Sequence, residues 1–204
     1  MRPSTLIVAA LCAALASPAV AQQPKPTPGL VRLVIETERG NINVTLDSAK
    51  APISVANFLR YVDAGAYDNG VFHRAVTPAN QPNDSVRIQV IQGGANPNRD
   101  PSLRFPAIPL ERTNVTGLKH RDGTLSMARA GPNTATSDFF ICIGDQPSLD
   151  FGGRRNPDGQ GFAAFGEVTS GMEIVRAIQQ SPVSAQRLTP PITIRRIGRV
   201  SGKG

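Results

Sequence analysis

The stretch SMARAGPNTATSDFFI, residues 126–141, joins two short apolar segments through a loop of small and polar residues. Strands are expected at Thr124–Ala128 and Phe139–Ile143, because each is a short apolar run bounded by turn-forming residues. Gly131 and Pro132 in the loop favour a turn over a helix. The stretch therefore predicts β-structure on both sides of a polar loop.

Alternating apolar side chains predict further strands on both sides of this stretch. The predicted strands are, in chain order, a hairpin over Val31–Leu46 that turns at Arg39-Gly40, followed by Val71–Val76, Val86–Ile91, Phe162–Val168 and Ile192–Val200. Loops rich in glycine, proline, asparagine and aspartate separate these segments, as is typical of short strands joined by turns.

Two stretches have helical spacing instead. Ala51–Gly65 places apolar side chains at i, i+3, i+4 and i+7, and Pro52 suits a first helical turn. A second helix is expected near Ser170, because Ser170 and Glu173 fit a capping box. About eight strands and two helices predict a mainly β fold, a closed eight-stranded antiparallel barrel capped by two α-helices.

The composition agrees with a single turn-rich domain. The chain has 204 residues, of which 40% are hydrophobic, and this apolar fraction excludes a wholly disordered chain. Its 19 glycines and 18 prolines exclude a helix bundle or a coiled coil, because both residues interrupt long helices.

The N-terminus has the layout of a secretory signal peptide. A basic start at Met1-Arg2 precedes the apolar run Leu6–Ala16, and the small residues at 19–21 predict cleavage after Ala21. The apolar run is too short for a spanning helix, so we expect no membrane insertion and a periplasmic or secreted protein. Residues 22–29 form a proline-rich linker, and the folded domain is expected over 30–201.

The residues that remain after cleavage argue against nucleic-acid binding, metal binding and thiol chemistry. The 22 basic residues less Arg2, against 15 acidic residues, leave a charge of +6, but the arginines are scattered, so no nucleic-acid site is expected. His73, His120 and the single remaining cysteine lack the spacing of a metal site, so neither metal nor cofactor is predicted. Cys142 lies between two isoleucines, which predicts a buried, unreactive thiol.

Six short motifs remain, and their order along the chain resembles that of the cyclophilin family of peptidyl-prolyl cis-trans isomerases. They are FHR at 72–74, QGG at 92–94, LKHRDGTLSMA at 118–128, AGPNT at 130–134, SDFFI at 137–141 and AFGEV at 164–168. APISVANF at 51–58 also looks like the family. The resemblance runs from about Val31 to Val200 and implies an eight-stranded barrel whose active groove lies on its outer surface.

The resemblance also implies roles for particular residues. Arg74 aligns with the catalytic arginine and Gln92 with the glutamine that supports it, and Phe72, on the same strand face as Arg74, is expected to brace it. The expected substrate contacts are the apolar socket Val90, Phe140 and Leu149, the backbone at Ala128 and Arg129, and the side chain of Asp138. The implied partners are proline-containing polypeptides, and we expect a monomer.

This sequence departs from the family pattern at several places, three of which bear on catalysis. About ten extra residues, Pro78 to Arg87, separate Arg74 from Gln92, and Gln89 stands where the family has an aromatic residue. Asp138 stands where many relatives carry glutamine, and its carboxylate is expected near Arg74, either orienting the guanidinium or competing for its donors. These departures leave an alternative, a non-catalytic peptide-binding or chaperone module on the same fold. A barrel that carries a small apolar ligand is a third hypothesis.

Overall fold

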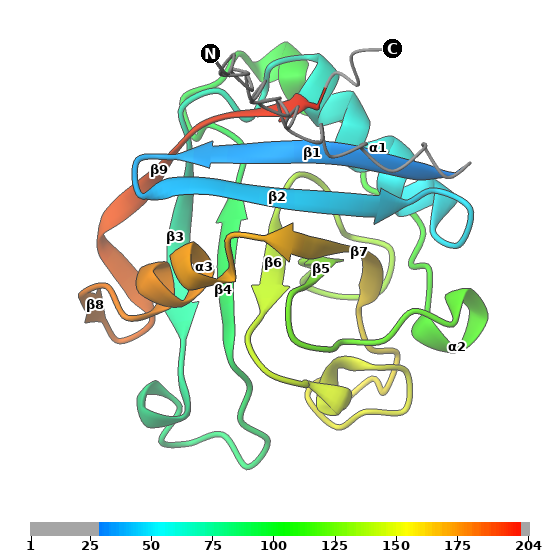
Figure 1. The fold of residues 1–204 in the computed structure, drawn as a ribbon. Coiled ribbons are helices and arrows are strands. Elements are labelled where there is room, and N and C mark those ends of the chain that lie inside the picture. The colour runs from blue at the N-terminus through cyan, green and yellow to red at the C-terminus, as the bar shows by residue number, and fades with distance from the viewer. Residues whose placement is uncertain (1–28, 201–204) are drawn as a thin grey trace, which may run out of the picture.

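Eight strands form a closed antiparallel β-barrel in the computed structural model, which describes residues 29–200 (Figure 1). Their order around the barrel is β1, β2, β7, β5, β6, β4, β3 and β9, and β9 pairs with β1 to close it. The bounds are β1 Leu30–Thr37, β2 Gly40–Asp47, β3 Gly70–Val76, β4 Val90–Gly94, β5 Thr124–Met127, β6 Phe139–Cys142, β7 Ala163–Ser170 and β9 Arg187–Arg199. The short β8, Val183–Ser184, adds a hairpin to β9. The predicted barrel is confirmed.

Two helices cover the barrel at opposite ends of β2. Helix α1 (Pro52–Asp63) follows the Asp47 end of β2 and packs on β2, β7 and β9, whereas α3 (Met172–Gln179) meets the Gly40 end and packs on β2, β3 and β4. The fold also has a single helical turn, α2 (Thr113–Thr116), and 3-10 turns at Pro78–Asn80, Pro101–Leu103 and Pro147–Leu149. Among the described residues, no helix has the length and apolar character needed to cross a bilayer.

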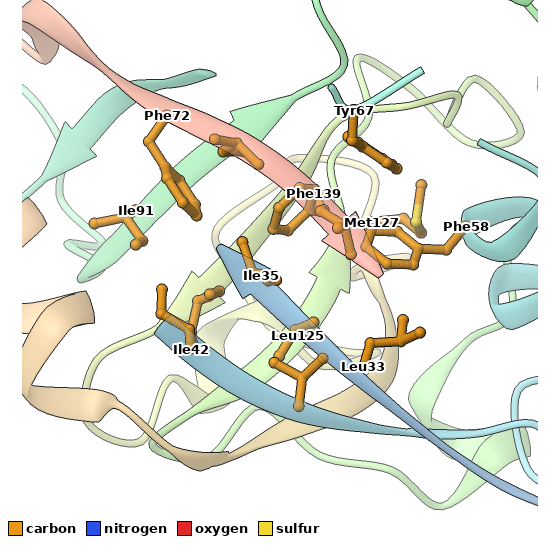
Figure 2. Packing of buried hydrophobic residues seen from close by; sticks show 14 of the residues in the cluster. Leu33, Ile35, Ile42, Phe58, Tyr67, Phe72, Ile91, Leu125, Met127 and Phe139 are labelled. Carbon is orange, nitrogen blue, oxygen red and sulfur yellow. The ribbon is translucent and has the colours of Figure 1, made fainter. Parts of the chain in front are cut away.

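The inward side chains of the strands and of α1 fill the barrel (Figure 2). The ring of Phe58, from α1, meets the ring of Phe139 edge-on at a centroid distance of 5.3 Å. Phe139 also lies 5.8 Å from the ring of Phe72 on β3. These aromatic side chains are fully buried, and each contributes about 1.5–3 kcal/mol of burial free energy, so the barrel is a packed core.

The face assigned to Phe72 was wrong, and a bulge in β3 explains the error. Phe72 pairs with Gly93 of β4 and Arg74 pairs with the next residue, Gln92, so His73 is an extra residue in the strand. Neighbouring residues of a strand face opposite sides of a sheet. Phe72 therefore lies inside the barrel and is fully buried, while Arg74 points outward. Phe72 packs beneath the strand instead of lining a groove beside Arg74.

The predicted strand over Val86–Ile91 also needs correction, because β4 begins only at Val90. The side chain of Gln81 takes the place of a neighbouring strand at Ile88: its Nε2 donates to Ile88 O (2.8 Å), and its Oε1 accepts from Ile88 N (3.1 Å). Gln81 is buried, so this pair of hydrogen bonds satisfies the backbone without extending the ladder.

The capping box expected at Ser170 and Glu173 does not form. Ser170 is the last residue of β7, and its hydroxyl accepts a hydrogen bond from Asn43 Nδ2 (2.8 Å). The N-cap of α3 is Gly171, whose φ of 94° is a left-handed conformation. A Cβ at this position would lie 2.5 Å from Asn41 O, so glycine is required by both conformation and space. The predicted leader, residues 1–21, and linker residues 22–28 lie outside the described residues.

Cys142 is fully buried on β6, as predicted. Burial raises the pKa of its thiol far above the ordinary value, and the carboxylate of Asp150 raises it further. Since the thiolate is the reactive species, we expect the native protein without residues 1–21, in which Cys142 is the single cysteine, to resist a thiol-specific disulfide reagent at pH 8 until it is unfolded. Cys142→Ala should lower the free energy of unfolding by about 1 kcal/mol, measured by denaturant titration. Rapid labelling of the native protein would contradict the assignment.

Candidate active site

A groove of about 500 Å³ lies on the outer surface of the barrel. It runs over the outward faces of β4 and β6 and is flanked by the segment after β5 and by the loop after the Pro147–Leu149 turn. All the predicted site residues except Phe72 line it, namely Arg74, Val90, Gln92, Ala128, Arg129, Asp138, Phe140 and Leu149.

Two glutamine side chains hold the guanidinium of Arg74 in the groove. Its Nη1 donates to Gln92 Oε1 (3.0 Å), while its Nε and Nη2 both donate to Gln186 Oε1 (2.9 and 2.6 Å). Partial burial lowers the pKa of Arg74, and the nearby charge of Arg155 lowers it further. Arginine nevertheless stays charged at physiological pH, so the groove contains a fixed, partly desolvated donor.

Gln186 was not predicted, and it connects the inserted loop to Arg74. Its Nε2 donates to Asn80 O (3.1 Å), and Asn80 belongs to the 3-10 turn that begins the insertion. The backbone carbonyl of Gln186 also accepts from Ala75 N (2.9 Å) on β3. The insertion therefore helps to orient the side chain that orients Arg74. No local motif marks Gln186, because its partners are brought together only by the pairing of β3 with β9.

The apolar part of the groove is a separate buried cluster on the outside of the barrel. It contains the three predicted socket residues, Val90, Phe140 and Leu149, together with Ile88. Ile88 was missed, although it has the same strand parity as Val90 and Gln92 and so shares their face. The ring of Phe162 meets the ring of Phe140 edge-on at a centroid distance of 5.3 Å. Phe162 therefore gives the socket an aromatic wall, although the position of the family's aromatic residue is occupied by Gln89.

A buried hydrogen-bonded chain supports the ring of Phe140 from beneath. His120 stacks on Phe140 at a centroid distance of 5.9 Å, and its Nδ1 and Nε2 lie 2.7 Å from Asp150 Oδ1 and 2.9 Å from Ser126 Oγ. Burial alone would raise the pKa of Asp150, but hydrogen bonds from His120 outweigh it and lower the pKa. Ser126 is fully buried, so this serine–histidine–aspartate arrangement is structural and has no access to a substrate.

Arg129 fastens the neighbouring loop to the groove. Its guanidinium donates to Gly161 O (2.7 and 2.8 Å) and to both carboxylate oxygens of Asp158 (2.8 and 2.9 Å), and it lies 5.0 Å over the ring of Phe162. The side chain is almost completely buried by these contacts. Strand β5 ends at Met127, so the backbone at Ala128 and Arg129 continues beside the groove beyond the sheet.

The expected contact between Asp138 and Arg74 is not formed. Asp138 Oδ2 lies 3.9 Å from His73 Nε2, and Oδ1 accepts from Ser137 Oγ (3.4 Å), whereas Arg74 is held by the two glutamines. The bulge in β3 turns His73 outward next to Arg74, so His73 is the basic side chain that lies beside Asp138. Asp138 lines the groove without competing for the donors of the arginine.

The inserted loop holds Arg155 at the groove. Arg155 Nη1 lies 2.9 Å from Asp84 Oδ2 and donates to Val86 O (2.7 Å), and its side chain lines the groove. Three arginines, Arg74, Arg129 and Arg155, therefore line the groove that contains the apolar socket. Across residues 29–200, no cluster of three histidine, cysteine, aspartate or glutamate side chains is arranged to hold a metal ion.

Solved structures with the same architecture define the class of fold. A crystal structure of a Cryptosporidium parvum cyclophilin-type peptidyl-prolyl cis-trans isomerase, determined in the presence of the dipeptide Ala-Pro, matches with a TM-score of 0.65 and 26% identity. The match covers 84% of this chain and 99% of that one. The fold is that of a cyclophilin.

Sequence relatives agree with this class. The model of the cyclophilin-type peptidyl-prolyl cis-trans isomerase family matches residues 32–199. Peptidyl-prolyl cis-trans isomerase A of Dickeya dadantii is 37% identical over 149 residues, covering 72% of this chain and 70% of that protein. Peptidyl-prolyl cis-trans isomerase B of Escherichia coli is 35% identical over 150 residues, covering 72% and 83%. The chain belongs to the cyclophilin-type peptidyl-prolyl isomerase family, and the predicted family and enzyme class are confirmed.

The hydrogen bonds of Gln186 generate a test of how Arg74 is positioned. Gln186→Ala removes the acceptor for two donors of the guanidinium, so we expect kcat to fall about tenfold with a smaller change in KM. The control Gln180→Ala removes an exposed glutamine outside the groove and should keep wild-type kinetics. Equal rates for the two variants, measured on one prolyl peptide, would exclude a positioning role for Gln186.

Proposed function

We propose that this protein catalyses rotation about X–Pro peptide bonds in extended segments of exported polypeptides. One observation carries the proposal: the charged donor of Arg74, held by Gln92 and Gln186, lies in the same groove as the apolar cluster around Phe140. A prolyl residue needs both features, a socket for its ring and a donor beside its nitrogen.

The chemistry follows from the electronic structure of the amide. Rotation about an X–Pro bond has a barrier of about 18–20 kcal/mol, because the nitrogen lone pair is delocalised into the carbonyl. In the twisted state this lone pair is localised on nitrogen and can accept a hydrogen bond. Arg74 donates that bond to the twisted amide and has no comparable bond to make with the planar one. Differential binding of this kind lowers the barrier without covalent chemistry.

The remaining residues position the substrate. The ring of the prolyl residue packs on Phe140, Val90 and Leu149, and the backbone beyond β5 pairs with the peptide as an added strand would. Gln92 accepts a hydrogen bond from Arg74 and lines the groove, so its amide can orient both Arg74 and the substrate. Because the groove residues are braced from beneath by the chain of hydrogen bonds at His120, little reorganisation is needed on binding.

Arg74→Ala should reduce the catalysed rate by about 10²–10³, because a charged hydrogen bond made mainly in the transition state is lost. Peptide affinity and the melting temperature should change much less, since the apolar cluster and the barrel remain intact. A protease-coupled assay with a prolyl peptide, a peptide titration and a thermal melt measure the three effects. Binding by both proteins without catalysis by either would favour the chaperone-module hypothesis.

We further propose that the chain acts as a monomer outside the cytoplasm, after cleavage of the predicted leader following Ala21. The basic start, the apolar run and the small residues at 19–21 support the export and the cleavage. Expression in a Gram-negative host should give a periplasmic product whose intact mass corresponds to a chain beginning at Gln22. A product that retains Met1 in the cytoplasmic fraction would contradict the proposal.

A further inference from the structure

A second pocket, of about 670 Å³, lies next to the groove on the other side of Asp138. It is formed by the outer face of β3, the segment Ala95–Arg99 that follows β4, and the first residues of β9. Its lining includes the apolar side chains of Val71, Pro97 and Leu188. The volume lies in the range of pockets that hold ligands, and nothing in the catalytic arrangement uses this pocket.

Two arginines in this pocket have no carboxylate partner among residues 29–200. Arg187 is exposed at the start of β9, and its guanidinium forms neither a salt bridge nor a hydrogen bond within the described part of the chain. Arg99 donates from Nη1 to Asn96 O (3.0 Å), but its buried Nε has no hydrogen-bond partner in that part of the chain. Neither guanidinium is therefore neutralised by a carboxylate of the described chain, so both can bind an anionic group in the pocket.

The only acidic side chain in the lining is Asp138, which already lies beside His73 and Ser137. Its carboxylate occupies the space that a Cβ on Gly94 would fill, so it packs directly against the backbone of β4. The lining therefore has two cations and one anion, and its charge complements that of a carboxylate ligand.

The pocket also adjoins the groove. Asp138 lines both cavities, so an extended polypeptide that occupies the groove can cross this residue and enter the second pocket. This adjacency favours a further part of the same polypeptide over an independent small molecule. The apolar lining accommodates the stem of a side chain, while Arg99 and Arg187 lie where its carboxylate would bind.

We propose that the pocket between β3 and β9 binds an acidic side chain of the polypeptide substrate, several residues from the prolyl bond, through Arg99 and Arg187. This inference rests on the proposed function, because it takes the occupant of the groove to be an extended prolyl segment. Acidic segments near a proline would then be preferred as substrates.

The test uses dye-labelled twelve-residue peptides with one central Ala-Pro. Glutamates are placed near the N-terminal end in one peptide and near the C-terminal end in another, and each has a glutamine-substituted partner. Dissociation constants are measured by fluorescence anisotropy at low salt for wild type, Arg187→Glu and the control Arg195→Glu. Arg195 is an exposed residue of the same strand that does not line the pocket, so the two variants change the net charge equally.

For one placement of the glutamates, wild type should bind the acidic peptide about fivefold more tightly than its glutamine partner, as expected for a partly exposed ion pair. Arg187→Glu should abolish or reverse this preference, and Arg195→Glu should retain it. Equal affinity of wild type for both members of each pair, or an equal loss in the two variants, would overturn the proposal.

The titration, combined with the protease-coupled isomerase assay on the same peptides, separates this inference from the proposed function. A preference for the acidic peptide without catalysed isomerisation would leave the pocket assignment standing and remove the isomerase function. Catalysis without a preference for the acidic peptide would leave the isomerase function standing and remove the pocket assignment. Failure of every peptide to bind would overturn both.

Discussion

The bulge at His73 in β3 is the constraint on which the active groove depends. It places Phe72 inside the barrel, against Phe139, and turns both His73 and Arg74 to the outside. Without the extra residue, strand alternation would put Phe72 and Arg74 on one face, and either the core would lose an aromatic ring or the barrel would bury a guanidinium. One irregular residue thus lets a packed core and a cationic groove share a strand.

A series of side-chain contacts then fixes Arg74 and the apolar socket beside it. The inserted loop holds Gln186 through Asn80, and Gln186 holds the guanidinium together with Gln92. On the apolar side, Arg129 fixes Phe162, Phe162 packs on Phe140, and His120 supports Phe140 from beneath. Rotation about an amide breaks no covalent bond, so a rigid donor and a rigid socket are what this reaction requires of a protein.

Periodicity predicted most of the fold, since apolar alternation and helical spacing depend only on local sequence. The hairpin over Val31–Leu46 and the helix after Ala51 were predicted in this way and observed. The resemblance to cyclophilins located Arg74, Gln92 and Phe140 in one groove. Strand alternation predicted the wrong face for Phe72, because the bulge at His73 has no sequence signature. Neither periodicity nor the resemblance identified the roles of Gln81, Gln186 and Arg155, because these roles depend on contacts that appear only in the folded chain.

The most direct test of the central claim, that Arg74 lowers the barrier to prolyl rotation, is exchange NMR of an Ala-Pro peptide with a catalytic amount of protein. It observes the cis and trans signals without a coupled protease. We expect exchange cross-peaks with wild type that are lost with Arg74→Ala, while the peptide remains bound by both proteins. Exchange at equal rates with both proteins, or peptide binding by wild type without any exchange, would contradict the claim.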